Sequence, residues 1–434
     1  MLHKILFLPT RFFPAISGAE FYFQRLAEIL IGSYNYNIDI YTSNAIDFKA
    51  LRNPNGKIIT PQENNFYKVN NLKINRFPVN YEHSEEQIIN KLNSIPAFKE
   101  LNLLDIHLVK FIKNGPYLKD LLDYLLNKPV SDYDLIHTTF FPYFNCIISL
   151  IIGNAINKPV ICTPFFHFSN PRYLDINLVH LLKKFDLLIA CTNLEKQFLV
   201  RKYNILPKKI IVIPMGVDHE KFKNISKKAM NSSYFKQKFF RKREKKFHLI
   251  LFCGYKNYEK GAISILKSIP YILKKIKKVY LVFIGPSTPA FNRELSKITK
   301  LKNTRIINFT PDNLTGYFDK KKIAAFREAD IYLMPSRSDA FGIAFLEAWA
   351  AGKPVIGARI GATTEVVREE IDGLLVEFDN PIDIANKVIK LLKSKKLRKK
   401  LGYTGQTKVS QNYTWELVAE KTHQTYQNLI KINQ

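Results

Sequence analysis

Two carboxylates eight positions apart stand out in the stretch PSRSDAFGIAFLEAWAAGKPVIG, residues 335–357. Asp339 lies in a loop of small residues, and Glu347 follows on a helical run that is otherwise apolar. We expect the helix to begin near Gly342 and Ile343, so that its first amide groups and its dipole could bind a phosphate. Glu347, one turn after Ile343, could accept hydrogen bonds from two vicinal ribose hydroxyls, with Asp339 facing the group to be transferred. The spacing therefore favours a nucleotide site.

A purely structural interpretation of the same pair exists. Asp339 could cap the helix, and Glu347 could pair with a lysine. An unpaired carboxylate among apolar side chains is costly, and for that reason we favour a binding role.

Two further loops could bind an anion. Ser17-Gly18 enters a helix after the first expected strand, and a glycine there lets backbone N–H groups approach a ligand. The segment 254–256 follows a later strand, and Lys260 stands at the start of the next helix, where a lysine suits phosphate. Each signal is weak alone, because small-residue turns and surface lysines are common.

Alternating strand and helix patterns must position these loops. KILFLP, a loop, FYFQRLAEILIG and NIDIYTS form a βαβ unit, and similar strands follow. The pattern stops after residue 222 and restarts at FHLILFCGY, so we predict an α/β protein with two doubly wound, Rossmann-like domains facing across a cleft. The predicted parts are an N-terminal domain (1–228), a basic linker (229–246), a C-terminal domain (247–412) and a final helix (413–434) that packs back on the first domain.

Two segments depart from this alternation. Residues 85–127 are long, helical and amphipathic, and we expect an inserted helical pair packed on its own domain. The alternative for this insertion is a surface that faces an acceptor or a membrane. Residues 387–402, KVIKLLKSKKLRKKLG, are predicted to form a solvated amphipathic helix.

The composition sets the limits of the interpretation. The 434 residues carry 66 Lys and Arg against 37 Asp and Glu, a formal charge of +29. Such a charge attracts anions, although a bias toward Asn, Ile and Lys could produce part of it. We see no nucleic-acid recognition module, so no nucleic-acid partner is expected. Four separated cysteines predict neither zinc nor disulfides, and the short N-terminal apolar run predicts a buried strand rather than a signal.

The ordered motifs resemble the large family of retaining GT-B glycosyltransferases that includes sucrose synthase and bacterial mannosyltransferases, glycosyltransferase family 4 or group 1. DAFGIAFLE resembles its pair of acids separated by seven residues, with Asp339 in place of the usual glutamate. FPAISGAE resembles its glycine-rich loop, with Ser17 for the first glycine, and GYKNYEKG resembles its phosphate loop, with Tyr255 where an arginine is usual. TPFFHF, VIPMGVDHEKF and GKPVIGARIGATTEVV are similar to further segments of the family.

The resemblance implies transfer of a sugar from a UDP- or GDP-linked donor to an acceptor, with retention at the anomeric carbon and without a metal or other cofactor. It implies that Asp339, His167 and Lys260 act at the reacting groups: Lys260 stabilises the leaving diphosphate, Asp339 positions the sugar, and His167 contacts a sugar hydroxyl or approaches the acceptor. The implied donor-binding residues are Ser17, Gly18, Tyr255, Lys256, Lys260, Phe341, Gly342, Ile343 and Glu347. Lys256 is the candidate to supply the diphosphate contact that the missing arginine would make.

Two alternatives stay open at this point. One is a GT-B enzyme that processes a nucleotide-sugar without an acceptor, such as an epimerase. The other is a degenerate, non-catalytic protein that binds a glycan or a partner. For a transferase we expect a glycan or lipid-linked acceptor, a cytoplasmic location and peripheral contact with an anionic membrane at its inner face, because the chain is basic and has no apolar run of about 18 residues.

Overall fold

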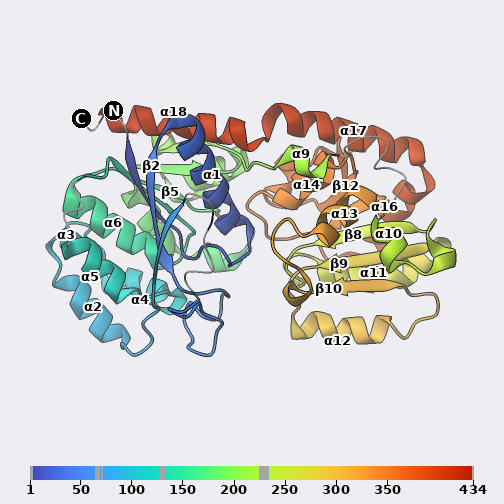
Figure 1. Cartoon of the computed structure of the whole chain (residues 1–434), viewed down its shortest axis with the longest axis horizontal. Helices are drawn as coiled ribbons and strands as arrows, with labels where there is room; N and C mark the ends of the chain where they lie inside the picture. Colours follow the sequence, from blue (N-terminus) through green and yellow to red (C-terminus); the bar gives the residue numbers. More distant parts are fainter. Residues whose placement is uncertain (1–2, 64–68, 70–71, 128–131, 224–233, 433–434) are drawn as a thin grey trace. The chain divides into compact units, whose positions relative to one another are not determined.

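The computed structural model describes residues 3–63, 69, 72–127, 132–223 and 234–432 (Figure 1). The chain forms two compact units, which are described separately below. Unit 1 comprises Met1–Pro214 and Trp415–Gln434, and unit 2 comprises Met215–Thr414. Within the described residues, every helix is too short or too polar to cross a lipid bilayer.

Unit 1 is built on a seven-stranded parallel sheet with the order β3-β2-β1-β4-β5-β6-β7. The inner strands are buried along almost their whole length, as expected when helices cover both faces of a sheet, and β4 places His137, Thr138 and Thr139 in that interior. The strands are β1 (Lys4–Leu8), β2 (Asn37–Ser43), β3 (Lys73–Phe77), β4 (Leu135–Thr139), β5 (Val160–Thr163), β6 (Leu187–Ala190) and β7 (Ile210–Val212).

The helices of unit 1 connect these strands. Residues 85–127 form four helices, α2 to α5, instead of the expected pair, because Pro96 and Gly115 interrupt the helical pattern. The helices are α1 (Gly18–Tyr34), α2 (Glu85–Asn93), α3 (Pro96–Lys99), α4 (Asp105–Asn114), α5 (Lys119–Asn127), α6 (Asn145–Ile156), α7 (Ile176–Val179), α8 (Asn193–Tyr203) and α18 (Trp415–Ile432), with short 3₁₀ turns η1 (Pro171–Tyr173), η2 (His180–Lys184) and η3 (Pro207–Lys209).

Helix α18 is part of unit 1 and packs beside α1 (Figure 1). Its Tyr426 is buried, and the hydroxyl lies 2.5 Å from Nδ1 of His137 on β4. The other ring nitrogen of His137 lies 2.8 Å from the Thr163 hydroxyl on β5. Burial lowers the pKa of His137 to about 3, so the ring is neutral in the folded protein. A polar network therefore fixes the end of the chain to the centre of the sheet.

Unit 2 repeats the architecture with a six-stranded parallel sheet of order β10-β9-β8-β11-β12-β13. Its strands are β8 (His248–Cys253), β9 (Val279–Ile284), β10 (Ile306–Phe309), β11 (Ile331–Met334), β12 (Val355–Ala358) and β13 (Gly373–Val376). Its helices are α9 (His219–Phe222), α10 (Tyr234–Phe239), α11 (Ala262–Lys275), α12 (Pro289–Ile298), α13 (Lys320–Glu328), α14 (Ile343–Ala350), α15 (Thr363–Val366), α16 (Pro381–Lys393) and α17 (Lys395–Asn412), with 3₁₀ turns η5 (Lys242–Glu244) and η6 (Pro311–Asn313).

Two basic segments of unit 2 differ from the expectation. The described part of the expected linker, 234–246, contains α10 and η5, and Phe235 is fully buried. Residues 224–233 lie outside the described residues. The segment 387–402 is not one helix, because Ser394 ends α16 and its hydroxyl accepts a hydrogen bond from Leu397 N to begin α17.

Candidate functional site

The helix that carries the second acid begins where the sequence indicates. After the buried strand β11, the chain turns at Gly342, whose φ of 96° is unfavourable for other residues, and α14 starts at Ile343. A Cβ on Gly342 would lie 2.6 Å from the Phe345 ring, so a glycine is needed for space as well. Among the residues that the structure describes, no side chain caps this helix, which rules out Asp339 as its N-cap. The Phe341 side chain is buried, with its ring 5.5 Å from that of Tyr413.

Glu347 has a cationic partner that the sequence argument did not identify. Its Oε1 lies 2.7 Å from Nζ of Lys322 on α13, and the side chains of both residues are less than a tenth exposed. The Lys322 ammonium also lies 3.7 Å from the centre of the Tyr317 ring. Burial and the charge of Glu347 raise the pKa of Tyr317 well above its usual value. The structural alternative, a glutamate paired with a lysine, is thus present, and burial of Glu347 is no longer evidence for a ligand by itself.

Lys260 and Asp339, which the resemblance gives separate roles, lie in contact. Nζ of Lys260 is 2.7 Å from Oδ2 of Asp339 and 3.0 Å from the carbonyl oxygen of Ser338. Both side chains are partly exposed, at 22% for Lys260 and 13% for Asp339. Lys260 lies in the loop after β8, and Asp339 lies in the loop after β11. These two strands are neighbours in the sheet. The carboxyl edge of the sheet therefore presents a cation and an acid side by side, next to the start of α14.

Close backbone packing holds these two loops together. Gly261 has a φ of 72°, and a Cβ at this position would lie 2.2 Å from the carbonyl oxygen of Pro335. Arg337 N donates to the carbonyl oxygen of Glu259 at 2.8 Å, and the two side chains form an ion pair. The site is thus built on two loops that cannot separate without loss of these contacts.

Lys256 is not available for the role that we expected of it. Its side chain is fully buried, and its Nζ donates to Asn308 Oδ1 at 2.5 Å and to the carbonyl oxygen of Phe309 at 2.9 Å. Burial lowers its pKa to about 8. Lys256 therefore ties its loop to the end of β10 and presents no charge to a diphosphate, a correction to the sequence analysis. Tyr255, in the place of the family's arginine, is 44% exposed.

In unit 1, the loop after β1 is organised by a buried ion pair. Arg11 contacts Glu20 at 2.8 Å, and both side chains are almost fully buried. The Ser17 hydroxyl donates to the same carboxylate, so it does not cap α1, which begins at Gly18. Ser17 and Gly18 are half-buried at the carboxyl edge of the sheet.

The loop after β5 carries His167, which is half-buried and stacks on Tyr173 with ring centres 4.8 Å apart. Its neighbour Phe166 donates its backbone N–H to Glu195 at 3.1 Å, and the same carboxylate accepts from Cys191 N at 2.7 Å. Glu195 is fully buried at the start of α8. This carboxylate connects the loops that follow β5 and β6, and it was not among the predicted site residues.

Comparison with known proteins identifies the family of the chain. A family model described as Glycosyl transferases group 1 matches residues 234–408, and one described as Glycosyltransferase Family 4 matches residues 84–221. The chain belongs to the group 1 glycosyltransferases. An uncharacterised glycosyltransferase of Methanocaldococcus jannaschii is 22% identical over 98% of this chain and 99% of its own. A D-inositol 3-phosphate glycosyltransferase of Corynebacterium jeikeium is 29% identical over 56% of this chain and 58% of its own.

Solved structures place this glycosyltransferase in the GT-B fold. Anabaena HepE, in a crystal structure with UDP and glucose, matches with a TM-score of 0.70 and 16% identity over 98% of this chain and 99% of that one. Sucrose-phosphate synthase of Thermosynechococcus elongatus matches with a TM-score of 0.68 and 17% identity over 99% of this chain and 100% of that one. The expected family and fold are confirmed.

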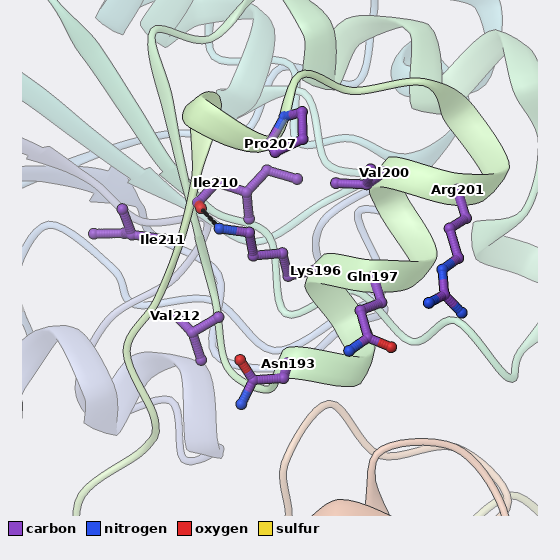
Figure 2. Close-up of a pocket in the computed structure, with 9 residues that line it drawn as sticks. All are labelled: Asn193, Lys196, Gln197, Val200, Arg201, Pro207, Ile210, Ile211 and Val212. Atoms are coloured by element: carbon purple, nitrogen blue, oxygen red, sulfur yellow. Dashed lines mark hydrogen bonds between the residues drawn. The ribbon is translucent and has the colours of Figure 1, made fainter.

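The glycosyltransferase also has a surface pocket of about 590 Å³ in unit 1, away from the predicted residues (Figure 2). It lies between α8 and the edge strand β7, with η3 at one end, and Lys196 donates across it to the carbonyl oxygen of Ile210 at 2.6 Å. None of the predicted site residues lines this pocket. The residues that line it are Asn193, Lys196, Gln197, Val200, Arg201, Pro207, Ile210, Ile211 and Val212.

Proposed function

We propose that this glycosyltransferase moves a sugar from a nucleotide-diphosphate sugar to a hydroxyl of a glycan or lipid-linked acceptor, with retention at the anomeric carbon and without a metal. One observation carries the proposal: the contact between Lys260 and Asp339 at the edge where α14 begins. A phosphate-binding cation beside an acid and a helix N-terminus suits a donor whose diphosphate is joined to a sugar. HepE, a structural neighbour, binds UDP and glucose, which makes UDP the first nucleotide to test.

Lys260 would act on the leaving diphosphate. An ammonium group has three N–H donors, and the contacts to Asp339 and Ser338 engage two of them. The third can bind a phosphate oxygen, while the pair with Asp339 holds the lysine in place. Together with the first amides of α14, this positive potential would stabilise the charge that develops as the diphosphate departs.

The chemistry balances without another reactant. The bond between the anomeric carbon and the diphosphate oxygen breaks, and a bond to the acceptor oxygen forms on the same face of the sugar. The acceptor's hydroxyl proton passes to the departing diphosphate, so no protein base is required. Asp339 would orient the sugar for this step, and water that entered in place of the acceptor would hydrolyse the donor.

Glu347 would hold the ribose while Lys322 neutralises its charge. This role can be separated from a purely structural one by comparing UDP with 2′-deoxy-UDP. If Glu347 binds the ribose, the parent protein prefers UDP and the Glu347→Gln variant loses that preference. A structural pair predicts equal affinities of the parent protein for the two nucleotides.

The first test is a thermal-shift screen with UDP, GDP, ADP and their sugars, in the presence of EDTA. A nucleotide at 100 times its dissociation constant should stabilise the protein by about 2.7 kcal/mol. We expect one nucleotide to do so, and Lys260→Gln to weaken its binding, whereas Lys300→Gln, an exposed lysine of unit 2, serves as the control. No shift with any nucleotide, in a folded sample, would contradict the donor site and favour a non-catalytic protein.

The reaction type needs a second test. Proton NMR of a donor incubated with the enzyme shows which anomer of the sugar is released or transferred first. The same anomer as in the donor supports retention, and the opposite one contradicts it. A new nucleotide-sugar with no released nucleotide would instead indicate an epimerase. We expect His167→Asn to slow transfer while leaving nucleotide affinity unchanged.

A further inference from the structure

The pocket between α8 and β7, here called the α8–β7 pocket, is lined by none of the residues assigned to the donor (Figure 2). Its volume of about 590 Å³ lies within the range of small-molecule sites, about 300–1,000 Å³. Helix α8 forms one wall, because residues 193, 196–197 and 200–201 recur at helical spacing and share a side of the helix. The edge strand β7 and the turn before it form the other wall.

The segment that builds the α8–β7 pocket is strongly cationic. Residues 193–214 supply the whole lining and contain five cations and one acid, Glu195. The carboxylate of Glu195 is buried, accepts hydrogen bonds from two backbone N–H groups, and does not line the pocket. Asp186, before β6, accepts from Val160 N on β5, which lies on the opposite side of β6 from β7. The pocket therefore attracts anions.

Three polar side chains of the lining can bind a ligand without breaking an existing contact. The Gln197 amide and the Arg201 guanidinium are exposed, and neither makes a hydrogen bond or an ion pair within the part of the chain that the structure describes. Lys196 donates one of its three N–H groups to the Ile210 carbonyl oxygen at 2.6 Å, which leaves two N–H groups available.

The edge of β7 is unsuited to pairing with an added peptide strand. Ile213 N donates to β6, so the alternating residues Ile210 and Val212 present their backbone polar groups to the open edge. Lys196 already occupies the Ile210 carbonyl oxygen, β7 has only three residues, and Pro214 has no N–H group. A small molecule in the pocket needs none of these backbone bonds.

We propose that the α8–β7 pocket binds an anionic carbohydrate, that is, a sugar that carries a phosphate or a carboxylate. Arg201 can bind the anion through two parallel N–H groups, and Lys196 adds a second positive charge. The Gln197 amide offers a donor and an acceptor, which match two neighbouring sugar hydroxyls. Val200 and Pro207 provide an apolar surface for the C–H face of the ring. The described lining has no aromatic side chain on which a base could stack, which disfavours a nucleotide.

Such a ligand can come from two sources, a free sugar phosphate or an acidic residue of a glycan chain. The test is isothermal calorimetry of the full chain with two probes, glucose 6-phosphate and trigalacturonic acid. We expect binding, and the probe that binds more tightly identifies the source. The proposal does not depend on the donor chemistry, because the two sites share no residue.

Matched variants locate the bound probe. Arg201→Gln should weaken binding at least tenfold, because it removes a charge-assisted pair of hydrogen bonds. The control is Lys202→Gln, which removes the same charge from the next residue of α8, outside the lining, and should bind as the parent protein does. Gln197→Leu should weaken binding of glucose 6-phosphate about fivefold and leave the affinity for inorganic phosphate unchanged. Circular dichroism shows that each variant is folded.

Equal losses of affinity in Arg201→Gln and Lys202→Gln would mean that net charge alone attracts the probes, and would overturn the proposal. The same conclusion follows if neither probe binds at millimolar concentration, or if inorganic phosphate binds as tightly as glucose 6-phosphate. Binding that disappears when the protein is saturated with UDP would place the probe in the donor site and also overturn it. Binding of a probe by a protein that fails the nucleotide screen would support the pocket and contradict only the donor site.

Discussion

The buried pair of Lys322 and Glu347 gives the sharpest test of the structure. Replacing Lys322 by Met preserves most of the side-chain volume and leaves the Glu347 carboxylate without its cation. The two side chains are 8% and 2% exposed, so water cannot compensate for the lost partner. Loss of one partner from such a pair costs about 3–5 kcal/mol. For a unit of the size of unit 2, this corresponds to a fall of about 6–20 °C in the melting temperature.

The complete cycle identifies the cause. Glu347→Leu should also be strongly destabilising, because it leaves the Lys322 ammonium buried and unpaired. The double variant Lys322→Met/Glu347→Leu should recover most of the loss, because an apolar pair of similar volume removes both desolvated charges. Recovery is incomplete because Tyr317 loses its interaction with Glu347, a cost of about 1–3 kcal/mol for a buried hydroxyl.

Urea unfolding followed by near-ultraviolet circular dichroism, with thermal melts in parallel, measures all four proteins. Two results would contradict a desolvated ion pair: a cost of less than about 1 kcal/mol for Lys322→Met, or a double variant as unstable as the sum of the two single ones. Either result would mean that the two groups do not interact as a desolvated pair. The burial of the Glu347 carboxylate would then again be evidence that it binds the ribose.

Three other predictions follow from the described contacts. Lys260→Gln should weaken binding of the preferred nucleotide about tenfold to a hundredfold, since one charge-assisted hydrogen bond contributes about 1.5–3 kcal/mol. Isothermal calorimetry measures this affinity, and Lys300→Gln should bind the nucleotide as the parent protein does. Tyr255→Arg places the arginine that is usual in the family at an exposed position and should tighten nucleotide binding about tenfold. Lys256→Met should instead lower the melting temperature and change nucleotide affinity less than twofold. The reverse pattern would contradict the buried placement of Lys256. His137 has a folded-state pKa of about 3 against 6.5 in the unfolded chain, so unfolding takes up a proton between these values. The free energy of unfolding should therefore fall as the pH drops through this window, by up to about 1.4 kcal/mol per pH unit. His137→Asn should flatten that slope in urea titrations at pH 4 to 7, and an unchanged slope would assign it to other groups.

Much of this protein could be predicted from local patterns. The strand runs KILFLP and HLILFCGY, with their following helices, predicted two doubly wound parallel sheets, because buried parallel strands need continuous apolar stretches and their crossovers need helices. The start of α14 followed from Phe341-Gly342, since a glycine with positive φ ends the loop. In both cases, the chemistry of a few adjacent residues determines the backbone conformation.

Local patterns failed where a helix boundary depends on a single residue. Ser394 divides the basic segment 387–402 into α16 and α17, although the apolar spacing continues through it. Four helices replace the expected pair in the insertion for the same reason. A serine or glycine is compatible with a helix interior, and only the packing on either side determines whether the chain bends there, whereas Pro96, which begins α3, is a break that the sequence itself contains.

The sequence by itself determined which residues carry charge at the carboxyl edge of unit 2, among them Lys260, Asp339 and Glu347. Only the tertiary structure decided which of these charges meet. It paired Lys260 with Asp339, 79 positions apart, and Glu347 with Lys322, 25 positions apart, and it turned Lys256 into the core. The physical reason is that a charge removed from water is stable only beside a partner. The fold selects that partner from distant parts of the chain: the sheet order brings β8 next to β11 for Lys260 and Asp339, and the packing of α13 on α14 brings Lys322 to Glu347.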